Sequence, residues 1–331
     1  MTVLDKARQV LDEGPICDSC LGRRFGLLSY GLTSRERGHA LRVTLSLEDD
    51  TDFEGEPDDC WVCDGFFDEE SLERWAERVV ESLEGYGFET YQVGTRVPPL
   101  VEENENLLDD LVGDEHAQGF STDFNREVGK RVGELLKEER SNAPEVGFDR
   151  PDVVAVVDLT EEAVDLQVNP LHVYGRYRKL ERDVPQTEWP CRDCDGTGEK
   201  GGEECDHCGG TGYMYEESVE ELIRPAVLDA FGGDGMVFHG AGREDVDALM
   251  LGDGRPFVAE VKEPRKRTYD LERLASEVNE SAKGKVEVGE LKLVSPDMVE
   301  RVKQLDASKR YRMTVELSKE VSGEELEDAL C

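Results

Sequence analysis

Eight of the nine cysteines form four Cys-x-x-Cys pairs, which is the pattern with the most chemical content in this sequence. Two residues between thiolates let both sulfurs face one ion, and two such pairs complete the four-sulfur shell of tetrahedral zinc. A redox role is the rival for any single pair, but four pairs favour metal binding. The predicted ligands are Cys17, Cys20, Cys60, Cys63, Cys191, Cys194, Cys205 and Cys208, whereas Cys331 stands alone and receives no role.

The two later pairs repeat the motif C-x-x-C-x-G-x-G and are separated by ten residues. Glycines after each pair permit the tight turn that frees backbone amides toward sulfur. This spacing predicts a four-cysteine zinc ribbon. The two earlier pairs lie 39 residues apart, so a small domain must bring them together, and two unrelated reduced pairs are the alternative. We therefore expect one or two structural Zn²⁺ sites.

A second polar constellation runs from His239 to Asp247 and contains Arg243 and Asp245. If this segment is a strand, the two side chains project together. A guanidinium beside a carboxylate keeps the carboxylate ionised and oriented, as a nucleophile requires. A surface ion pair without catalytic function is the alternative interpretation.

Apolar periodicity predicts the elements that position these residues. In the first half we expect helices over residues 3–11, 34–47, 69–83 and 125–140, and strands over 88–93, 152–158 and 163–168, the last two forming a hairpin. In the second half we expect helices over 218–231, 270–279 and 295–304, and strands over 236–238, 246–251, 256–262, 286–294 and 311–317. This mixture predicts an α+β, multidomain protein.

The net charge of -38, from 77 Asp and Glu against 39 Lys and Arg, at first argues against a phosphate-bearing partner. The acids are spread over folded segments, and only 13 residues are lysine. At about 1 M salt the Debye length is near 3 Å, so such a carboxylate density is tolerable. The composition favours a halophilic source, with an acidic mesophilic protein as the alternative.

One window departs from this acidity. Residues 255–312 contain 14 Lys and Arg against 11 Asp and Glu, a net of +3, whereas the rest of the chain has a net of -41. Its basic side chains include Arg255, Lys262, Arg265, Lys266 and Arg267. Such a run is usually a solvated loop. In so acidic a chain it also suggests an anion-binding face.

No apolar run approaches the roughly 20 residues that span a bilayer, and the N-terminus lacks the layout of a secretory signal. We expect a soluble, cytoplasmic protein of two or three domains, with no membrane partner.

Five segments together resemble, in order, the archaeal, haloarchaeal-type family of tRNA pseudouridine synthases that act on uridines 54 and 55. They are Asp18-Ser-Cys20-Leu-Gly-Arg-Arg-Phe25, Val93-Gly-Thr-Arg-Val-Pro-Pro99, Val173-Tyr-Gly-Arg-Tyr-Arg-Lys179, Gly242-Arg-Glu-Asp-Val-Asp247 and Gly254-Arg-Pro-Phe257. The resemblance implies four parts. These are an N-terminal zinc-binding region (1–65), a THUMP-like RNA-binding domain (66–182), the zinc ribbon insertion (183–216) and a pseudouridine synthase mixed-sheet catalytic domain (217–331) that is incomplete at its C-terminus.

The implied reaction isomerises uridine in the tRNA T-arm and needs no redox or organic cofactor. On the family pattern Asp245 is the catalytic aspartate, with Asp247 as its competitor, and Arg243 holds it ionised. Tyr311 packs on a base that has left its stack. The resemblance also places Arg176 and Tyr177 with the basic side chains of the window as contacts to RNA.

Two other functions remain open at this point. One is a non-catalytic zinc and THUMP module that binds tRNA. The other is a zinc-ribbon scaffold for protein interactions, because C-x-x-C-x-G-x-G repeats also occur in some chaperones. An Asp245→Ala variant that binds tRNA without modifying it would support the enzyme.

Overall fold

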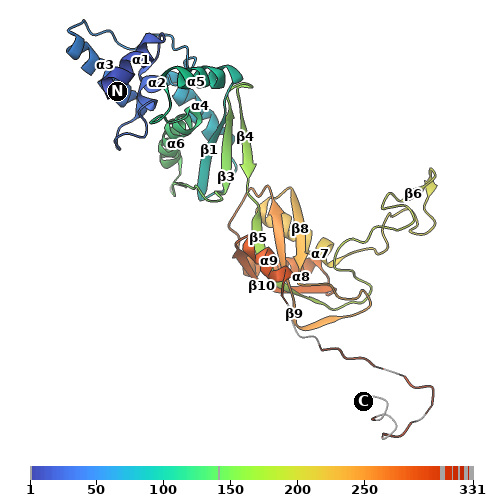
Figure 1. Ribbon diagram of the computed structural model, residues 1–331. Helices are drawn as coiled ribbons and strands as arrows, with labels where there is room; N and C mark the ends of the chain where they lie inside the picture. The colour runs from blue at the N-terminus through green and yellow to red at the C-terminus, as the bar shows by residue number, and fades with distance from the viewer. Residues whose placement is uncertain are drawn as a thin grey trace.

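The protein is described from a computed structural model, whose described residues are 2–140, 142–305, 310–314, 316–319, 321–323 and 327. These residues contain two four-stranded sheets and one two-stranded sheet. Figure 1 shows two bodies joined end to end, with the N-terminal helices on the first and a ribbon projecting from the second. None of the described helices is both long and apolar enough to cross a membrane.

Three helices begin the first body: α1 (Val3–Asp12), α2 (Asp18–Arg23) and α3 (Ser34–Asp49). Capping boxes start α1 at Thr2 and α3 at Thr33, where each threonine hydroxyl accepts the amide three residues on. Helices α2 and α3 cross in backbone contact, since a Cβ on Gly38 would lie 1.9 Å from the carbonyl oxygen of Asp18. Glycine is therefore required at this crossing.

The first sheet has the order β2-β1-β3-β4. Its strands are β1 (Thr90–Arg96), β2 (Glu145–Val146), β3 (Val153–Asp158) and β4 (Ala163–Val168), and its helices are α4 (Glu69–Ser82), α5 (Pro99–Val112) and α6 (Phe120–Glu139). Strand β1 runs parallel to β2 and β3, whereas β3 and β4 form an antiparallel hairpin. Trp75 of α4, Tyr91 of β1 and Phe124 of α6 are buried in one core shared with the N-terminal helices.

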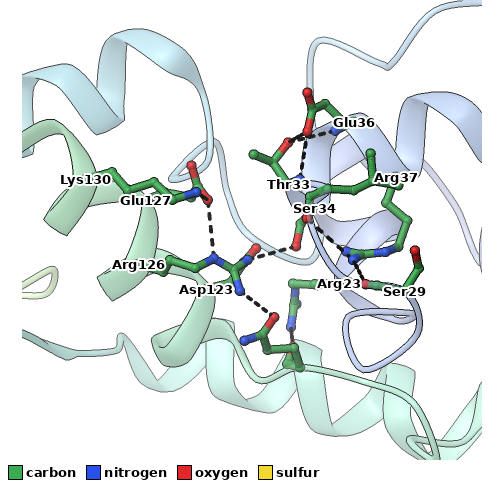
Figure 2. A network of polar contacts seen from close by, with 12 residues as sticks. Arg23, Ser29, Thr33, Ser34, Glu36, Arg37, Asp123, Arg126, Glu127 and Lys130 are labelled. Carbon is green, nitrogen blue, oxygen red and sulfur yellow. Dashed lines mark hydrogen bonds and ion pairs between the residues drawn. The ribbon is translucent and has the colours of Figure 1, made fainter. Parts of the chain in front are cut away.

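A polar network joins the start of α3 to α6 (Figure 2). Arg126 of α6 pairs with the buried Asp123, lies 3.4 Å from Glu127 and reaches the hydroxyl of Ser34 at 3.5 Å. On the α3 side, the hydroxyl of Thr33 donates to Glu36 at 2.9 Å. This network and the shared core make the N-terminal helices part of the first body.

The second sheet has the antiparallel order β10-β5-β9-β8. Its strands are β5 (Leu171–Lys179), β8 (Gly235–Gly240), β9 (Met250–Lys262) and β10 (Val286–Val294), and its helices are α7 (Val219–Phe231), α8 (Leu271–Ser281) and α9 (Asp297–Lys303). Phe231, Phe257 and Leu274 are buried in its separate core. Strands β6 (Glu199–Lys200) and β7 (Glu203–Glu204) form a small ribbon inserted between β5 and α7.

Most of the predicted elements are confirmed, including the hairpin of β3 and β4 and the cap of α7 by Ser218. Helix α5 is not among the predicted elements, because two consecutive prolines are typical of a break in regular structure. Pro99 instead occupies the first turn of this helix, where its missing N–H is not needed. The strand expected over 246–251 is wrong in its first part, since β9 begins only at Met250.

Two further expectations differ from the structure. The boundary at residue 182 would place β5 in the first body, but β5 pairs with β9 and β10, so the second body begins at this strand. Of the strand expected over 311–317, residues 311–314 and 316–317 are described, and they lie outside any strand.

Candidate active site and metal centres

Arg243 and Asp245 lie on the loop of residues 241–249, which joins neighbouring strands β8 and β9. Two hydrogen bonds hold the start of the loop against β9. The amide of Ala241 donates to the carbonyl of Pro256 at 2.9 Å, and Arg255 Nη1 donates to the carbonyl of Ala241 at 2.7 Å. The segment is therefore a tethered loop at the sheet edge, not the strand on which the pairing of Arg243 and Asp245 depended.

Glu244 is the residue of this loop that turns into the protein, with a side chain only 4% exposed. Its carboxylate accepts from the hydroxyl of Tyr177 at 2.9 and 2.8 Å and lies 3.0 Å from Nε of Arg255. Gln186 completes the group, because its Nε2 donates to the Tyr177 hydroxyl at 2.8 Å and to the carbonyl of Gly242 at 3.0 Å. Burial, with the charge of Glu244, raises the pKa of Tyr177, so the phenol keeps its proton and donates.

Lys179 holds the other side of the same loop. Its buried Nζ donates to three carbonyls, those of Val184 at 2.9 Å, Asp245 at 3.1 Å and Val246 at 2.9 Å. Burial lowers the pKa of Lys179, yet three acceptors match the three donors of an ammonium group. The carbonyls of Asp245 and Val246 are thereby fixed to β5.

Asp245 and Arg243 are exposed, since Glu244 between them points inward. The guanidinium of Arg243 lies over the ring of Trp189, 4.8 Å from its centre. No ion pair joins Arg243 and Asp245 among the residues that the structure describes. The expected contact is therefore not present, because the loop does not project residues i and i+2 together and the aromatic face attracts the cation.

Three residues expected to contact RNA bind groups of the protein itself. Tyr177 is fully buried, and Arg255 is 6% exposed beside Glu244. Arg176 donates to the carbonyls of Asp253 at 2.7 Å and Gly254 at 2.9 Å. The structure corrects the expectation for Tyr177 and Arg255. They support the loop from inside, and for Tyr177 the alternation along β5 is the signal that could have shown this.

The remaining expected contacts divide into two groups. Lys262, Arg265 and Lys266 are exposed, whereas Arg267 lies between the two bodies with a side chain 11% exposed. Tyr311 is 75% exposed, in the described stretch 310–314. No contact between Tyr311 and the Asp245 loop is present within the described part of the chain.

The first cysteine cluster brings Cys17, Cys20, Cys60 and Cys63 together, with ligand atoms within 4.8 Å of one another. The sulfurs of Cys17 and Cys63 are 3.7 Å apart, and the amide of Cys20 donates to the sulfur of Cys17 at 3.4 Å. Tetrahedral bonds of about 2.3 Å imply sulfur separations of about 3.8 Å. Burial and the neighbouring sulfurs raise the pKa of Cys20, so four thiolates here require a cation. The residues fit a bound metal ion.

The second cluster, in the ribbon, has the same geometry. Sulfurs are separated by 4.0 Å for Cys191 and Cys205 and by 3.7 Å for Cys194 and Cys208. Backbone amides donate to two of them at 3.3 Å, from Gly198 to Cys194 and from Gly212 to Cys208. Gly198 has φ +76°, and a Cβ there would lie 2.3 Å from the carbonyl of Gly210. This glycine is needed for the turn that delivers its amide to sulfur.

Comparison with known proteins agrees with this arrangement. Residues 172–330 match the family described as Pus10, C-terminal, and residues 75–158 match the archaeal Pus10 THUMP domain. The first match begins within β5, which is also the strand with which the second sheet begins along the chain. The two matches together cover 243 of the 331 residues, and the N-terminal helices α1, α2 and α3 and strand β4 lie outside them.

Curated relatives are similar over nearly the whole chain. A protein of Halorubrum lacusprofundi named tRNA pseudouridine synthase Pus10 is 54% identical, over 100% of this chain and 76% of its own length. Proteins of the same name from Methanothrix thermoacetophila and Pyrococcus furiosus are 41% and 38% identical. They are covered over 75% and 74% of their lengths.

Proposed function

The chain belongs to the Pus10 family and is a tRNA pseudouridine synthase, an isomerase, and we propose that it acts on uridines 54 and 55 of the T-arm through Asp245. The supporting observation is the tethered loop. Lys179 fixes the carbonyl of Asp245, and the preceding residue, Glu244, is held by its buried carboxylate. The carboxylate of Asp245 is therefore presented outward. A nucleophile that must meet a flipped base needs such an exposed and fixed position.

The proposed reaction breaks the bond between N1 of uracil and C1′ of the ribose, turns the base and joins C5 to C1′. A proton leaves C5, and N1 carries a proton in the product, so the isomerisation is balanced without a redox cofactor. In this proposal the carboxylate of Asp245 attacks C1′ as the bond to N1 breaks, and it leaves again when C5 of the turned uracil joins C1′.

Other groups in the proposed site have supporting roles. Tyr311 is exposed and offers an aromatic face to the base, and Lys262, Arg265 and Lys266 offer charges to phosphates. Arg243 is proposed to pair with Asp245 by leaving Trp189, since its long side chain is exposed. Arg243→Lys tests this role, because a lysine keeps the charge but loses the planar group that lies on Trp189.

We propose that both cysteine clusters bind zinc and that the ions are structural. The supporting features are the four-sulfur ligand sets, which leave no open position, and the buried sulfurs. Metal analysis of the purified chain should give two zinc ions per molecule. A single ion or none would contradict this proposal.

The proposed environment is molar salt. Dense acid on both bodies would repel RNA at low salt, whereas a short Debye length screens it. The net charge of -41 outside the window 255–312 and the similarity to a Halorubrum protein support this part of the proposal.

The test of the proposed function is mass-spectrometric mapping of pseudouridine in a tRNA transcript incubated with the chain in molar KCl. Transcripts with cytidine at position 54 or at position 55 show which uridine is used. We expect pseudouridine at both positions of the unaltered transcript and at the remaining uridine of each altered one. Pseudouridine elsewhere in the tRNA, or none at either position, would refute the proposal.

A further inference from the structure

Within the described part of the chain, the two bodies are joined by one covalent connection, one loop contact and an exposed ion pair 3.9 Å long between Arg150 and Asp297. The covalent connection is only Asn169-Pro170, between the end of β4 and the start of β5. Pro170 restricts this connection because its ring fixes φ. The loop contact comes from residues 263–269 after β9, whose Arg265 carbonyl accepts the amide of Gly87 at 2.8 Å. Because the bodies are joined at more than one point, neither body can rotate freely about the Asn169-Pro170 connection.

Arg267 is the centre of the loop contact. Its Nη1 lies 3.2 Å from Oδ1 of Asp152, and its Nη2 donates to the carbonyls of Asp152, at 2.9 Å, and of Asn169. All three acceptors belong to the end of the first sheet or to the connection that follows it. A guanidinium reaches several acceptors at once with a rigid fork, which an ammonium group cannot reproduce.

The partner carboxylate is itself held in place. Oδ2 of Asp152 accepts the amides of Glu89 at 2.8 Å and Thr90 at 3.1 Å, at the start of β1. The guanidinium of Arg265 adds a contact over the ring of Tyr86, 4.4 Å from its centre. The contact thus links the first strand, the hairpin and the connection of the first body to one loop of the second.

We propose that Arg267 is a positioning residue that fixes the angle between the two bodies, so that a tRNA contacting the first body presents its T-arm to the Asp245 loop. This inference rests on the proposed function. The side chain of Arg267 is 11% exposed and its donors are directed to protein acceptors, so it is not available to phosphates. Its effect depends on the length of the RNA, because only an RNA that touches both bodies senses the angle between them.

The experiment compares Arg267→Ala with the unaltered chain on two RNAs, a full tRNA and an isolated T-arm stem-loop. For the full tRNA, kcat/KM should fall about tenfold or more, since small misplacements of reacting groups cost large factors. For the stem-loop it should not change. Arg267→Lys keeps the charge but not the forked guanidinium group. Its kcat/KM for the full tRNA should lie between those of Arg267→Ala and the unaltered chain.

The angle itself is measured by single-molecule energy transfer between dyes on unnatural residues replacing the exposed Leu107 of α5 and Ser276 of α8. Arg267→Ala should broaden the distance distribution. The matched control is Arg74→Ala, which removes an exposed arginine of α4. It should change neither the distribution nor the ratio of the two activities.

Three results would overturn the inference. They are an unchanged distance distribution in Arg267→Ala, an equal loss on both RNAs, and a smaller salt dependence of tRNA affinity, which would mark a phosphate contact. If the unaltered chain modifies neither RNA, the proposed function fails. The distance distributions alone would then decide whether Arg267 fixes the joint.

Discussion

Replacing Glu244 tests whether a buried carboxylate determines the position of its exposed neighbour Asp245. In Glu244→Ala, Arg255 loses a counter-ion 3.0 Å away, and the hydroxyl of Tyr177 loses an acceptor at 2.8 Å. Both partners are at most 6% exposed, so water cannot replace the lost carboxylate. Removing one member of a buried pair costs about 3–5 kcal/mol, which is the expected fall in the free energy of unfolding.

Glu244→Gln separates shape from charge. Glutamine keeps an acceptor for Tyr177 but leaves Arg255 with only the carbonyl of Ala241, so we expect an intermediate loss of about 1.5–3 kcal/mol. In both variants the loop around Asp245 is released on one side. The turnover rate should then fall about a hundredfold in Glu244→Ala, with tRNA affinity little changed.

The assay is urea unfolding followed by tryptophan fluorescence, together with single-turnover pseudouridine formation. Of the three tryptophans, Trp189 lies in the second half of the chain, beside the loop. The matched control is Glu280→Gln, on the exposed side of α8. If both Glu244 variants unfold and react like this control, the carboxylate does not position the loop and the reasoning is refuted.

Three further predictions follow from other contacts. Lys179→Met removes the donor to three carbonyls and should lower the turnover rate about tenfold without weakening tRNA binding; unchanged turnover would contradict it. Gly198→Ala places a Cβ 2.3 Å from the carbonyl oxygen of Gly210, so the proposed zinc site of the ribbon should be lost. Metal analysis should then show half the zinc of the unaltered chain, and an unchanged zinc content would contradict the prediction. Burial lowers the pKa of His172 below its ordinary 6.5, so the unfolded state gains a proton first as the pH falls. The free energy of unfolding should therefore decrease between about pH 6.5 and the lower folded-state pKa, and His172→Gln should remove this slope in urea unfolding; an equal slope in both proteins would refute it.

Much of the fold could be predicted because local patterns dominate it. The Cys-x-x-Cys spacing identified both clusters of candidate ligands, and apolar periodicity located α4 and α7 within a residue or two. The tight pairing of β3 with β4 also followed from alternation and a short turn. These features depend on residues that are near one another in the sequence.

The rest depends on contacts between distant residues. Nothing local distinguishes Glu244 from Asp245, since the partners that draw Glu244 inward are Tyr177 and Arg255, on two other strands. Arg267 likewise looks like a member of a basic RNA-binding run until the first body supplies Asp152 as its partner. Charge patterns predicted an anion-binding face, but only the fold separates the exposed cations from the buried ones.

The most direct test of the central claim is the amount of pseudouridine that Asp245→Asn and Asp247→Asn form in tRNA under single-turnover conditions. The two aspartates are exposed, lie on one loop and would lose the same charge. We predict that Asp245→Asn binds tRNA but forms no pseudouridine, and that Asp247→Asn remains active. Full modification by Asp245→Asn, or loss of modification only in Asp247→Asn, would contradict the account.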